Sequence, residues 1–250
     1  MKMDKEIAHQ TIKLYAKELK LPSFNNYETV INRLDNDEGY ADFLVKMMKN
    51  EKDSRDEKGR KNRIRKAKFP YIKTFDELEL DRFENVDPAK IRELASCDFI
   101  DRKENVVLIG NPRTGKTHLS IAIGIKACQK GYKVRFITAH DLVYQMIEAK
   151  SEKQLTSLTK ALMKVDLLII DELSYLTLDK QQSSLLFKII SDRSERRSTI
   201  ITSNLAFSEW ETIFGDKMLV SAIAGRMMFH SCAINANSSR PYTDDYFGVS

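Results

Sequence analysis

Apolar residues recur at helical spacing in the first quarter of the chain. Two sets of side chains follow this spacing: Ile7, Thr11, Leu14 and Tyr15, and then Tyr40, Phe43, Leu44, Met47 and Met48. Residues at positions i, i+3, i+4 and i+7 lie along one side of a helix, and such a stripe is normally buried. Pro22 and the stretch 35–39 separate the two sets. We therefore expect a helical N-terminal domain over residues 1–68, with both stripes in its core.

The pattern changes after residue 98, where short apolar runs alternate with stretches of helical spacing. Five runs are expected to be strands: Val106–Ile109, Lys133–Thr138, Leu167–Ile170, Thr199–Thr202 and Cys232–Ala236. Apolar strands that alternate with helices are typical of a parallel sheet with covering helices. The sequence thus predicts an α/β core, a parallel five-stranded sheet flanked by helices, over residues 99–250. Residues 69–98 are expected to be a linker and a short helix that begins at Asp87 and Pro88.

Composition excludes several classes of protein. With 250 residues, of which 42% are hydrophobic and 31% charged, the chain can bury a core. No apolar run approaches the roughly 20 residues that cross a bilayer, and the start MKMDKEIAHQ lacks the apolar segment of a signal peptide. The three cysteines are far apart and there are only four histidines, which argues against a disulfide framework or a zinc cluster. A cytoplasmic protein that does not enter a membrane is expected.

The excess of positive charge is confined to the first quarter of the chain. The chain holds 41 basic and 36 acidic residues, and the first 68 positions hold 17 and 12 of them, which accounts for the whole net charge of +5. The stretch 58–68, KGRKNRIRKAK, contains no acid. Such a run is either a solvated helical face or a contact surface for a polyanion. We expect contacts with the phosphate backbone of DNA from Lys58, Arg60, Lys61, Arg63, Arg65, Lys66 and Lys68.

A phosphate-binding loop follows the first expected strand. Residues 110–117 match the pattern G-x-x-x-x-G-K-[ST] and precede a helical stretch. In this arrangement backbone N–H groups surround phosphates, a lysine reaches the β- and γ-phosphates, and the last hydroxyl can bind Mg²⁺. Lys116 and Thr117 are the corresponding residues here. The expected nucleotide-binding set is Gly110, Asn111, Pro112, Arg113, Thr114, Gly115, Lys116, Thr117 and His118, although His118 could simply pack under the loop.

Two adjacent acids end the third expected strand. Asp171 and Glu172 follow the apolar run from Val165, at the edge where open α/β sheets bind ligands. Asp171 would hold the hydration shell of Mg²⁺ beside Thr117, while Glu172 would orient or deprotonate an attacking water molecule. An acid at a strand end can also cap a helix, but the phosphate-binding loop upstream favours the catalytic interpretation.

Other candidate residues are less specific. Asn204 ends the fourth expected strand, where its amide could contact the γ-phosphate or the attacking water, or simply form a turn. An arginine at a subunit boundary can stabilise the charge that develops in phosphoryl transfer, and Arg226, Arg196 and Arg197 are alternatives for this role. Phe69, Tyr71 and Phe75 either line an adenine pocket or pack within the linker.

These motifs resemble the IstB-like ATPases, the transposition helper proteins of bacterial insertion sequences. The similar segments are GNPRTGKTHLSIAIGIKAC, VDLLIIDELSYL, RRSTIITSN, FSEW followed by IFGD, LKLPSF, RIRKAKFPYIKTFDELEL and IRELASCDFI. They cover roughly residues 10–237. This family is related to the DnaC helicase loaders within the initiator group of AAA+ ATPases.

The resemblance implies an AAA+ P-loop NTPase core behind a helical, DNA-engaging N-terminal domain. ATP-bound subunits of such proteins assemble as homo-oligomers on duplex DNA and present a target site to the partner transposase. By position, residues 110–117 resemble the Walker A loop, Asp171 and Glu172 the Walker B pair, Asn204 the sensor residue, and Arg226 the arginine finger that reaches a neighbour's ATP. Only 13 residues follow Asn237, which is too few for a C-terminal helical lid domain.

The sequence departs from the family pattern at several positions, and several functions remain as alternatives. Arg113 stands where most AAA+ proteins have glycine, Gly225 stands where an acid usually precedes the finger, and the usual G-x-S-Y-R ending is missing. A positive φ at Arg113 would cost about 1 kcal/mol or more. The alternatives are a helicase loader with the same ATPase site, a small-molecule P-loop kinase, and a scaffold that binds nucleotide without hydrolysing it.

Overall fold

The computed structural model describes residues 4–79, 83, 86–228 and 231–237, which form two compact units. The units are Met1–Asn62 and Arg63–Ser250, so the division falls before the end of the basic stretch rather than after Lys68. One helix, α3 (Tyr40–Ala67), contributes to both units. Its last turn belongs to the second unit because Ala67 is fully buried in the core there and Ile64 packs against the same cluster.

The first unit is helical. It contains α1 (Lys5–Glu18), a short 3-10 helix η1 (Pro22–Asn26), α2 (Tyr27–Ile31) and the first part of α3. The α1 helix is capped by Asp4, whose carboxylate accepts a hydrogen bond from the Glu6 N–H at 2.8 Å. Buried Glu51 of α3 accepts hydrogen bonds from the Ser23 backbone and hydroxyl and from Arg55. Polar contacts thus connect α3 to η1.

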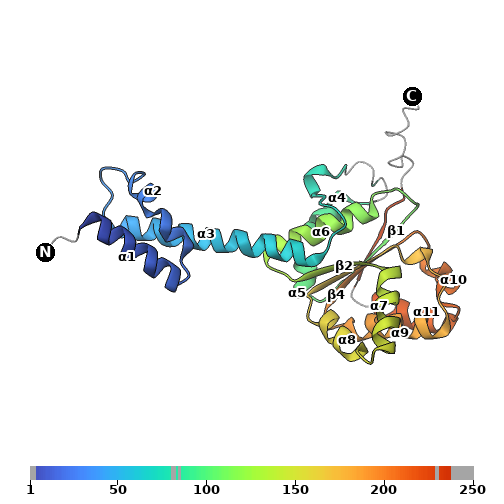
Figure 1. Cartoon of the computed structure of the whole chain (residues 1–250). Coiled ribbons are helices and arrows are strands. Elements are labelled where there is room, and N and C mark those ends of the chain that lie inside the picture. Colours follow the sequence, from blue (N-terminus) through green and yellow to red (C-terminus); the bar gives the residue numbers. More distant parts are fainter. Residues whose placement is uncertain (1–3, 80–82, 84–85, 229–230, 238–250) are drawn as a thin grey trace, which may run out of the picture. The chain divides into compact units, whose positions relative to one another are not determined.

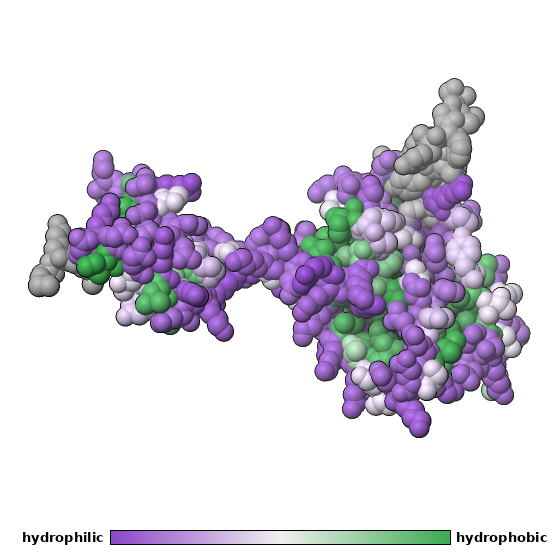
Figure 2. Space-filling model, in the orientation of Figure 1, coloured by the Kyte–Doolittle hydropathy of each residue, from purple (hydrophilic) through white to green (hydrophobic). Residues whose placement is uncertain are grey.

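The expected burial of the two apolar stripes in this unit is wrong for most of their residues, although Met47 of the second stripe is fully buried. On α1, Ile7 is 59% and Leu14 53% exposed, whereas Ala16 on the other side of the helix is buried. Tyr15, Tyr40, Leu44 and Met48 are exposed as well. Figure 2 shows hydrophobic residues at the surface of this unit. Helical spacing tells which residues share a face, but it does not tell whether another element covers that face.

The second unit is built on a parallel five-stranded sheet, as predicted (Figure 1). The strands are β1 (Asn105–Ile109), β2 (Val134–Thr138), β3 (Leu167–Asp171), β4 (Ser198–Ser203) and β5 (Ser231–Asn235), in the spatial order β2-β3-β4-β1-β5. Each observed strand lies within two residues of its expected boundaries. Strand β4 lies between β1 and β3, so it separates the strand before the phosphate-binding loop from the strand that carries Asp171.

Helices cover both faces of the sheet (Figure 1). They are α4 (Pro88–Ser96), α5 (Asp98–Asp101), α6 (Lys116–Lys130), α7 (Ala139–Ser151), α8 (Leu155–Met163), α9 (Lys180–Arg193), α10 (Glu211–Phe214) and α11 (Lys217–Met228), with 3-10 helices η2 (Phe75–Glu77), η4 (Leu173–Tyr175) and η5 (Phe207–Glu209). Strand residues alternate between two apolar clusters: Val106 and Leu108 face the cluster with α4 and α6, and Val107 faces the other. As expected, α4 begins with Pro88 and is capped by Asp87.

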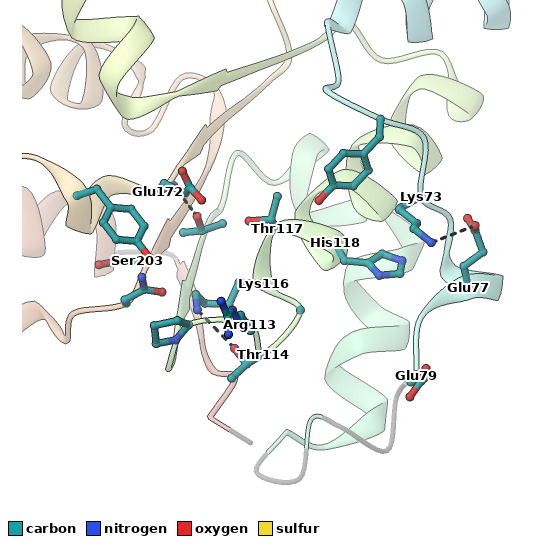
Figure 3. A pocket seen from close by; sticks show the side chains of 16 residues that line it. Lys73, Glu77, Glu79, Arg113, Thr114, Lys116, Thr117, His118, Glu172 and Ser203 are labelled. Atoms are coloured by element: carbon teal, nitrogen blue, oxygen red, sulfur yellow. Dashed lines mark hydrogen bonds and ion pairs between the residues drawn. The ribbon is translucent and has the colours of Figure 1, made fainter. Parts of the chain in front are cut away.

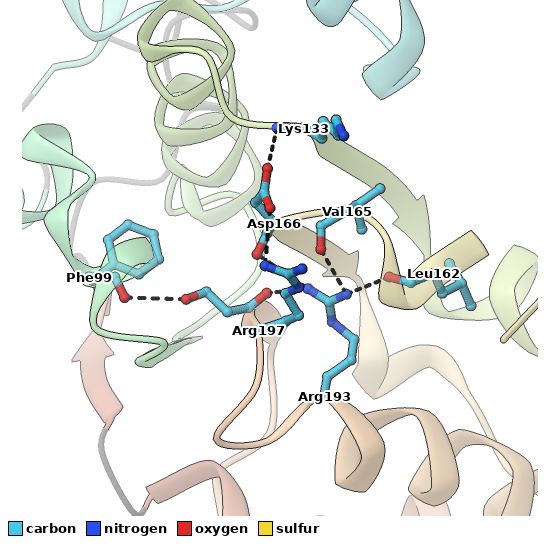
Figure 4. A network of polar contacts seen from close by, with 8 residues as sticks. Phe99, Lys133, Leu162, Val165, Asp166, Arg193 and Arg197 are labelled. Carbon is cyan, nitrogen blue, oxygen red and sulfur yellow. Dashed lines mark hydrogen bonds and ion pairs between the residues drawn. The ribbon is translucent and has the colours of Figure 1, made fainter. Parts of the chain in front are cut away.

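A buried arginine joins the amino ends of β3 and β4 (Figure 4). The Arg193 guanidinium is fully buried and donates to the Leu162 carbonyl at 2.5 Å and the Ser198 carbonyl at 2.6 Å. Burial lowers the pKa of Arg193 to about 9. Nearby Asp166 accepts from the Lys133 N–H at 2.9 Å and from Arg197 at 3.3 Å. These contacts fix the edge of the sheet opposite the strand ends that carry the candidate site.

Within the described ranges, no helix is long and apolar enough to span a membrane.

Candidate nucleotide-binding site

The loop between β1 and α6 is held against the end of β5. The Ala236 N–H donates to the Ile109 carbonyl at 2.6 Å, and the Asn111 N–H donates to the Asn237 side-chain oxygen at 2.7 Å. A Cβ atom at Gly110 would lie 2.7 Å from the backbone carbon of Ala236. Glycine is therefore required at position 110 because another backbone passes too close for a side chain.

The loop itself turns through left-handed backbone conformations. Arg113 has φ of 65° and Gly115 has φ of 90°. The positive φ considered for Arg113 is thus present, although its side chain makes it unfavourable. Helix α6 begins directly after Gly115, and no side chain caps its first N–H groups. These N–H groups and the positive end of the helix dipole are suited to bind an anion.

Lys116 is buried at the base of the loop (Figure 3). Its ammonium group donates to the Gly110 carbonyl at 2.7 Å and to the Asn111 carbonyl at 2.6 Å. Burial lowers the pKa of Lys116 to about 8, and the negative charges of Asp171 and Glu172 oppose this shift. The loop therefore holds an ammonium group in a poorly solvated place, where a phosphate would stabilise its charge.

Asp171 lies next to Thr117, as the sequence predicts. The Thr117 hydroxyl lies 3.0 Å from both carboxylate oxygens of Asp171, and the Thr202 hydroxyl lies 2.6 Å from one of them. Burial raises the pKa of Asp171, against the lowering effect of the bonds from Thr202 and Thr117 and of the Lys116 charge.

Thr117 and Asp171 are suited to a Mg²⁺ ion that is also bound by substrate phosphates. They are less suited to a metal ion that is bound by protein side chains alone. Hydroxyl and carboxylate oxygens are the donors that Mg²⁺ prefers, and it commonly binds through one or two side chains and substrate phosphates. In the part of the chain that is described, no group of three or more His, Cys, Asp or Glu side chains could hold a metal ion. Thr117 and Asp171 would therefore hold Mg²⁺ together with a bound phosphate.

Glu172 extends from the end of β3 into the same region. Its backbone is left-handed, with φ of 60° and ψ of 47°, and its N–H donates to the Thr202 hydroxyl at 2.9 Å. Glu172 is exposed, and its partial desolvation together with the nearby Asp171 charge raises the pKa of its carboxyl group. Sequence patterns gave no sign of the left-handed backbone or of the part played by Thr202.

One cavity of about 650 Å³ collects most of the expected nucleotide-binding residues. Its lining includes Pro112, Arg113, Thr114, Gly115, Lys116, Thr117, His118, Glu172 and Asn204. Gly110 and Asn111 form the loop behind it, and Asp171 is buried next to Thr117. Asn204 is half-buried, and its N–H donates to the Ser174 hydroxyl at 2.9 Å. Asn204 and Glu172 therefore line the same cavity, and the sensor role of Asn204 stays a prediction.

Part of the cavity wall comes from the linker before α4. Tyr71, Lys73, Glu77 and Glu79 line it, and the His118 ring lies 3.3 Å from the Thr74 carbonyl (Figure 3). Phe69 and Phe75 instead pack against the apolar core. Of the three linker aromatics considered for an adenine pocket, only Tyr71 reaches the cavity. A capping box formed by Thr74 and Glu77 fixes the turn that carries this part of the wall. The spacing of these two residues was the sequence signal that could have predicted the turn.

The candidate arginine fingers lie outside this cavity. Arg226 of α11 donates to the Ala222 carbonyl at 3.2 Å and lies 5.2 Å from the centre of the Phe187 ring. Arg197 pairs with Asp166 at the opposite edge of the sheet. A finger supplied by Arg226 would have to act on the nucleotide of a neighbouring subunit, which stays a prediction.

The basic stretch is less uniform than its composition suggests. In the first unit, Arg60 and Lys61 pair with Glu57, the acid just before the stretch, while Lys58 is exposed. In the second unit, the Arg63 guanidinium donates to the Cys128 carbonyl at 2.7 Å. Arg65, Lys66 and Lys68 are exposed. The expected DNA contacts thus include side chains with competing roles inside the protein.

Comparison with known proteins identifies the family. A family model described as IstB-like ATP binding protein matches residues 14–243. The chain belongs to this family. Among the relatives of this IstB-like protein, one from Geobacillus stearothermophilus is named as an ATP-binding protein of insertion sequence IS5376. It is 41% identical over 196 residues, which are 78% of each chain. Another, named for insertion sequence IS21 of Pseudomonas aeruginosa, is 36% identical over 78% of this chain and 74% of its own.

Solved structures agree with the fold of an IstB-like protein. DnaA from Aquifex aeolicus, in a structure bound to AMPPCP, matches with a TM-score of 0.55 and 21% identity over 66% of this chain and 50% of that one. DnaI matches with a TM-score of 0.55 and 16% identity over 65% of this chain and 90% of that one. At these identities the likeness concerns the fold alone. The predicted fold class, a parallel five-stranded sheet flanked by helices, is confirmed.

Proposed function

We propose that this IstB-like protein binds and hydrolyses ATP. One observation carries the proposal. At the carboxyl ends of β1, β3 and β4, the structure places four side chains in one region: Lys116, Thr117, Asp171 and Glu172. This arrangement provides a cation for the phosphates, oxygen donors for a divalent ion, and a carboxylate facing the cavity. Because the two acids are adjacent, one can support the metal ion while the other activates a water molecule. This favours hydrolysis over transfer of the phosphoryl group to a small acceptor molecule.

The residues would divide the reaction between them. The loop N–H groups and Lys116 would hold the β- and γ-phosphates, and Thr117 and Asp171 would hold Mg²⁺, which supplies positive charge to the phosphates when bound. Glu172 would accept a proton from water as the water oxygen bonds to the γ-phosphorus. The bond between that phosphorus and the β–γ bridging oxygen breaks, releasing ADP and phosphate. Asn204 would orient the water, and Arg226 of a neighbouring subunit would stabilise the developing charge.

We further propose that ATP controls assembly on duplex DNA and so assists a transposase in target selection. The names of the two relatives, both of which connect an ATP-binding protein with an insertion sequence, support this role. The exposed basic residues of stretch 58–68 support contact with a phosphate backbone. ATP bound between subunits would favour the DNA-bound homo-oligomer, and hydrolysis would loosen it.

Glu172→Gln tests the hydrolytic role. The substitution keeps the shape of the side chain but removes the proton acceptor, so Mg²⁺-dependent phosphate release should fall by about 100-fold or more while ATP binding persists. Phosphate release with and without duplex DNA, together with calorimetric titration with ATP, measures both. Glu148→Gln on α7, outside the cavity, is the matched control. Unchanged turnover in Glu172→Gln would contradict the assignment.

The assembly role needs a direct view of the complex. Electron microscopy of the protein on duplex DNA with a slowly hydrolysed ATP analogue should show ordered oligomers, which ADP should not support. Addition of the cognate transposase should then bring the transposase to this DNA. Binding of a replicative helicase instead would support the loader alternative.

A further inference from the structure

Thr202 connects both acids of the site to the interior of the sheet. Its side chain is on β4, is 1% exposed and makes two hydrogen bonds to β3 and the residue that follows it. The hydroxyl oxygen accepts the Glu172 N–H at 2.9 Å. Its own proton is then directed to Asp171, whose carboxylate oxygen lies at 2.6 Å. A hydroxyl has one proton and two lone pairs, so both bonds can exist together.

The first of these bonds acts on the direction of the Glu172 side chain. With φ of 60° and ψ of 47°, Glu172 has a backbone conformation that its Cβ disfavours. Such a conformation persists only where the surroundings enforce it. The Thr202 hydroxyl holds the N–H of this residue, and Ser174, two residues further, receives the Asn204 N–H at 2.9 Å. The end of β4 thus holds the turn on both sides.

The second bond acts on the carboxylate of Asp171. Thr117 also bonds this carboxylate, but Thr117 is on α6, the helix that begins at the phosphate-binding loop. The bond from Thr117 therefore comes from an element that a nucleotide would contact. Thr202 also lines the cavity, but it lies on β4, a strand that is paired with both β1 and β3, so its bond fastens Asp171 to the sheet rather than to the helix of the loop.

We propose that Thr202 is a positioning residue that sets both the metal-supporting carboxylate and the water-activating carboxylate. This inference rests on the proposed ATPase function and adds a residue to it. Through Asp171, Thr202 would strengthen the binding of Mg²⁺ with nucleotide. Through the Glu172 backbone, it would hold the carboxylate towards the attacking water. Groups that orient a metal-supporting side chain in this way typically contribute about 10- to 100-fold to affinity or activity.

Thr202→Val tests the proposal, because valine keeps the branched shape and removes the hydroxyl. At saturating Mg²⁺, we expect kcat for ATP hydrolysis to fall about 10- to 100-fold, with a much smaller change in KM. The Mg²⁺ concentration needed for half-maximal binding of a fluorescent, slowly hydrolysed ATP analogue should rise within the same range. Thr202→Ser should restore both, because serine returns the hydroxyl.

The matched control is Thr199→Val on the same strand. Thr199 is equally buried, and its hydroxyl accepts from Arg193 at 3.1 Å at the far end of the sheet. This variant should lower the melting temperature but leave kcat and the Mg²⁺ dependence unchanged. If Thr202→Val does not fold, as circular dichroism would show, the smaller Thr202→Ala replaces it.

The outcomes separate this proposal from the ATPase assignment. A wild-type protein without turnover would overturn the ATPase function, and the Mg²⁺-dependent binding assay would still decide the role of Thr202. Wild-type values for Thr202→Val in both assays would overturn the positioning role and leave the ATPase function standing. Failure of Thr202→Ser to restore the activity and the Mg²⁺ affinity would also overturn it, since packing rather than the hydroxyl would then be responsible.

Discussion

At the scale of single residues, two ionisable side chains of the site, Lys116 and Asp171, lie where water reaches them poorly. Lys116 is buried against backbone carbonyls, and Asp171 is buried between two hydroxyls. Burial penalises the charged form of each side chain. The charged form is therefore stabilised strongly when an oppositely charged partner enters the cavity. A triphosphate with a divalent ion supplies both partners together.

Proton uptake should accompany ATP binding at alkaline pH. The pKa of Lys116 in the free protein is lowered to about 8, so above that pH the side chain is mostly neutral. A bound phosphate favours the charged form and raises the pKa, so binding takes up a proton and the affinity falls as pH rises through about 8.

Isothermal titration at pH 8.5, in buffers of different ionisation enthalpy, measures this uptake, which should approach one proton per ATP as the pH exceeds about 8. Lys116→Met, which cannot take up a proton, should lose the dependence on buffer along with most of the affinity. Equal heats in all buffers for the wild-type protein would contradict the burial-lowered pKa.

At the scale of elements, the close approach of two backbones shapes the phosphate-binding loop. The end of β5 passes so close to Gly110 that a side chain there would touch Ala236. Although β5 is far from the loop in the sequence, it helps to determine the curvature of the loop.

Gly110→Ala should destabilise the protein by about 1–3 kcal/mol, because a Cβ would have to displace backbone atoms. ATP affinity should fall as well, since the loop would move. Gly225→Ala is the control: it lies in α11 with nothing within 4 Å of an added Cβ, so it should be neutral or stabilise the protein by up to about 1 kcal/mol. Urea unfolding compares the two, and equal stability would contradict the close approach.

Sequence patterns predicted where strands lie much better than they predicted which residues those strands and helices contact. The five strands were predictable because each is a short apolar run between polar turns, and Lys116 and Asp171 meet because parallel strands end at one edge. Exposure of Ile7 and Leu14 was not predictable, since spacing does not reveal which face is covered. The contacts of Thr202 were not predictable either, because they depend on the register between β4 and β3, which the spacing of apolar residues does not give.

At the scale of the whole molecule, the basic stretch 58–68 lies almost entirely on α3, the helix that contributes to both compact units. Within stretch 58–68, Arg63 has an internal role through the Cys128 carbonyl, whereas Lys66 and Lys68 are exposed. Charge counts alone treat these residues as equal. Their surroundings predict different contributions to DNA binding.

Replacing Lys66 and Lys68 together with Gln should weaken binding to duplex DNA of any sequence. The slope of log affinity against log salt concentration should become shallower by about 0.9 for each phosphate that the variant no longer neutralises. Arg63→Gln should chiefly lower the melting temperature, because it removes a hydrogen bond inside the second unit. Fluorescence anisotropy at several salt concentrations makes the comparison, and an unchanged slope in the lysine variant would place the DNA-binding surface elsewhere.

The central place of β4 limits how the protein can vary. Its residues pair with β1 on one side and β3 on the other, and the strand and the residue after it supply Thr202, Ser203 and Asn204. Side chains alternate between the two faces of a sheet, so a single inserted or deleted residue within β4 would turn Thr202 away from the acids and shift Asn204. Length changes in this family should therefore accumulate in the surface loops, while β4 should vary only by substitutions that preserve its number of residues.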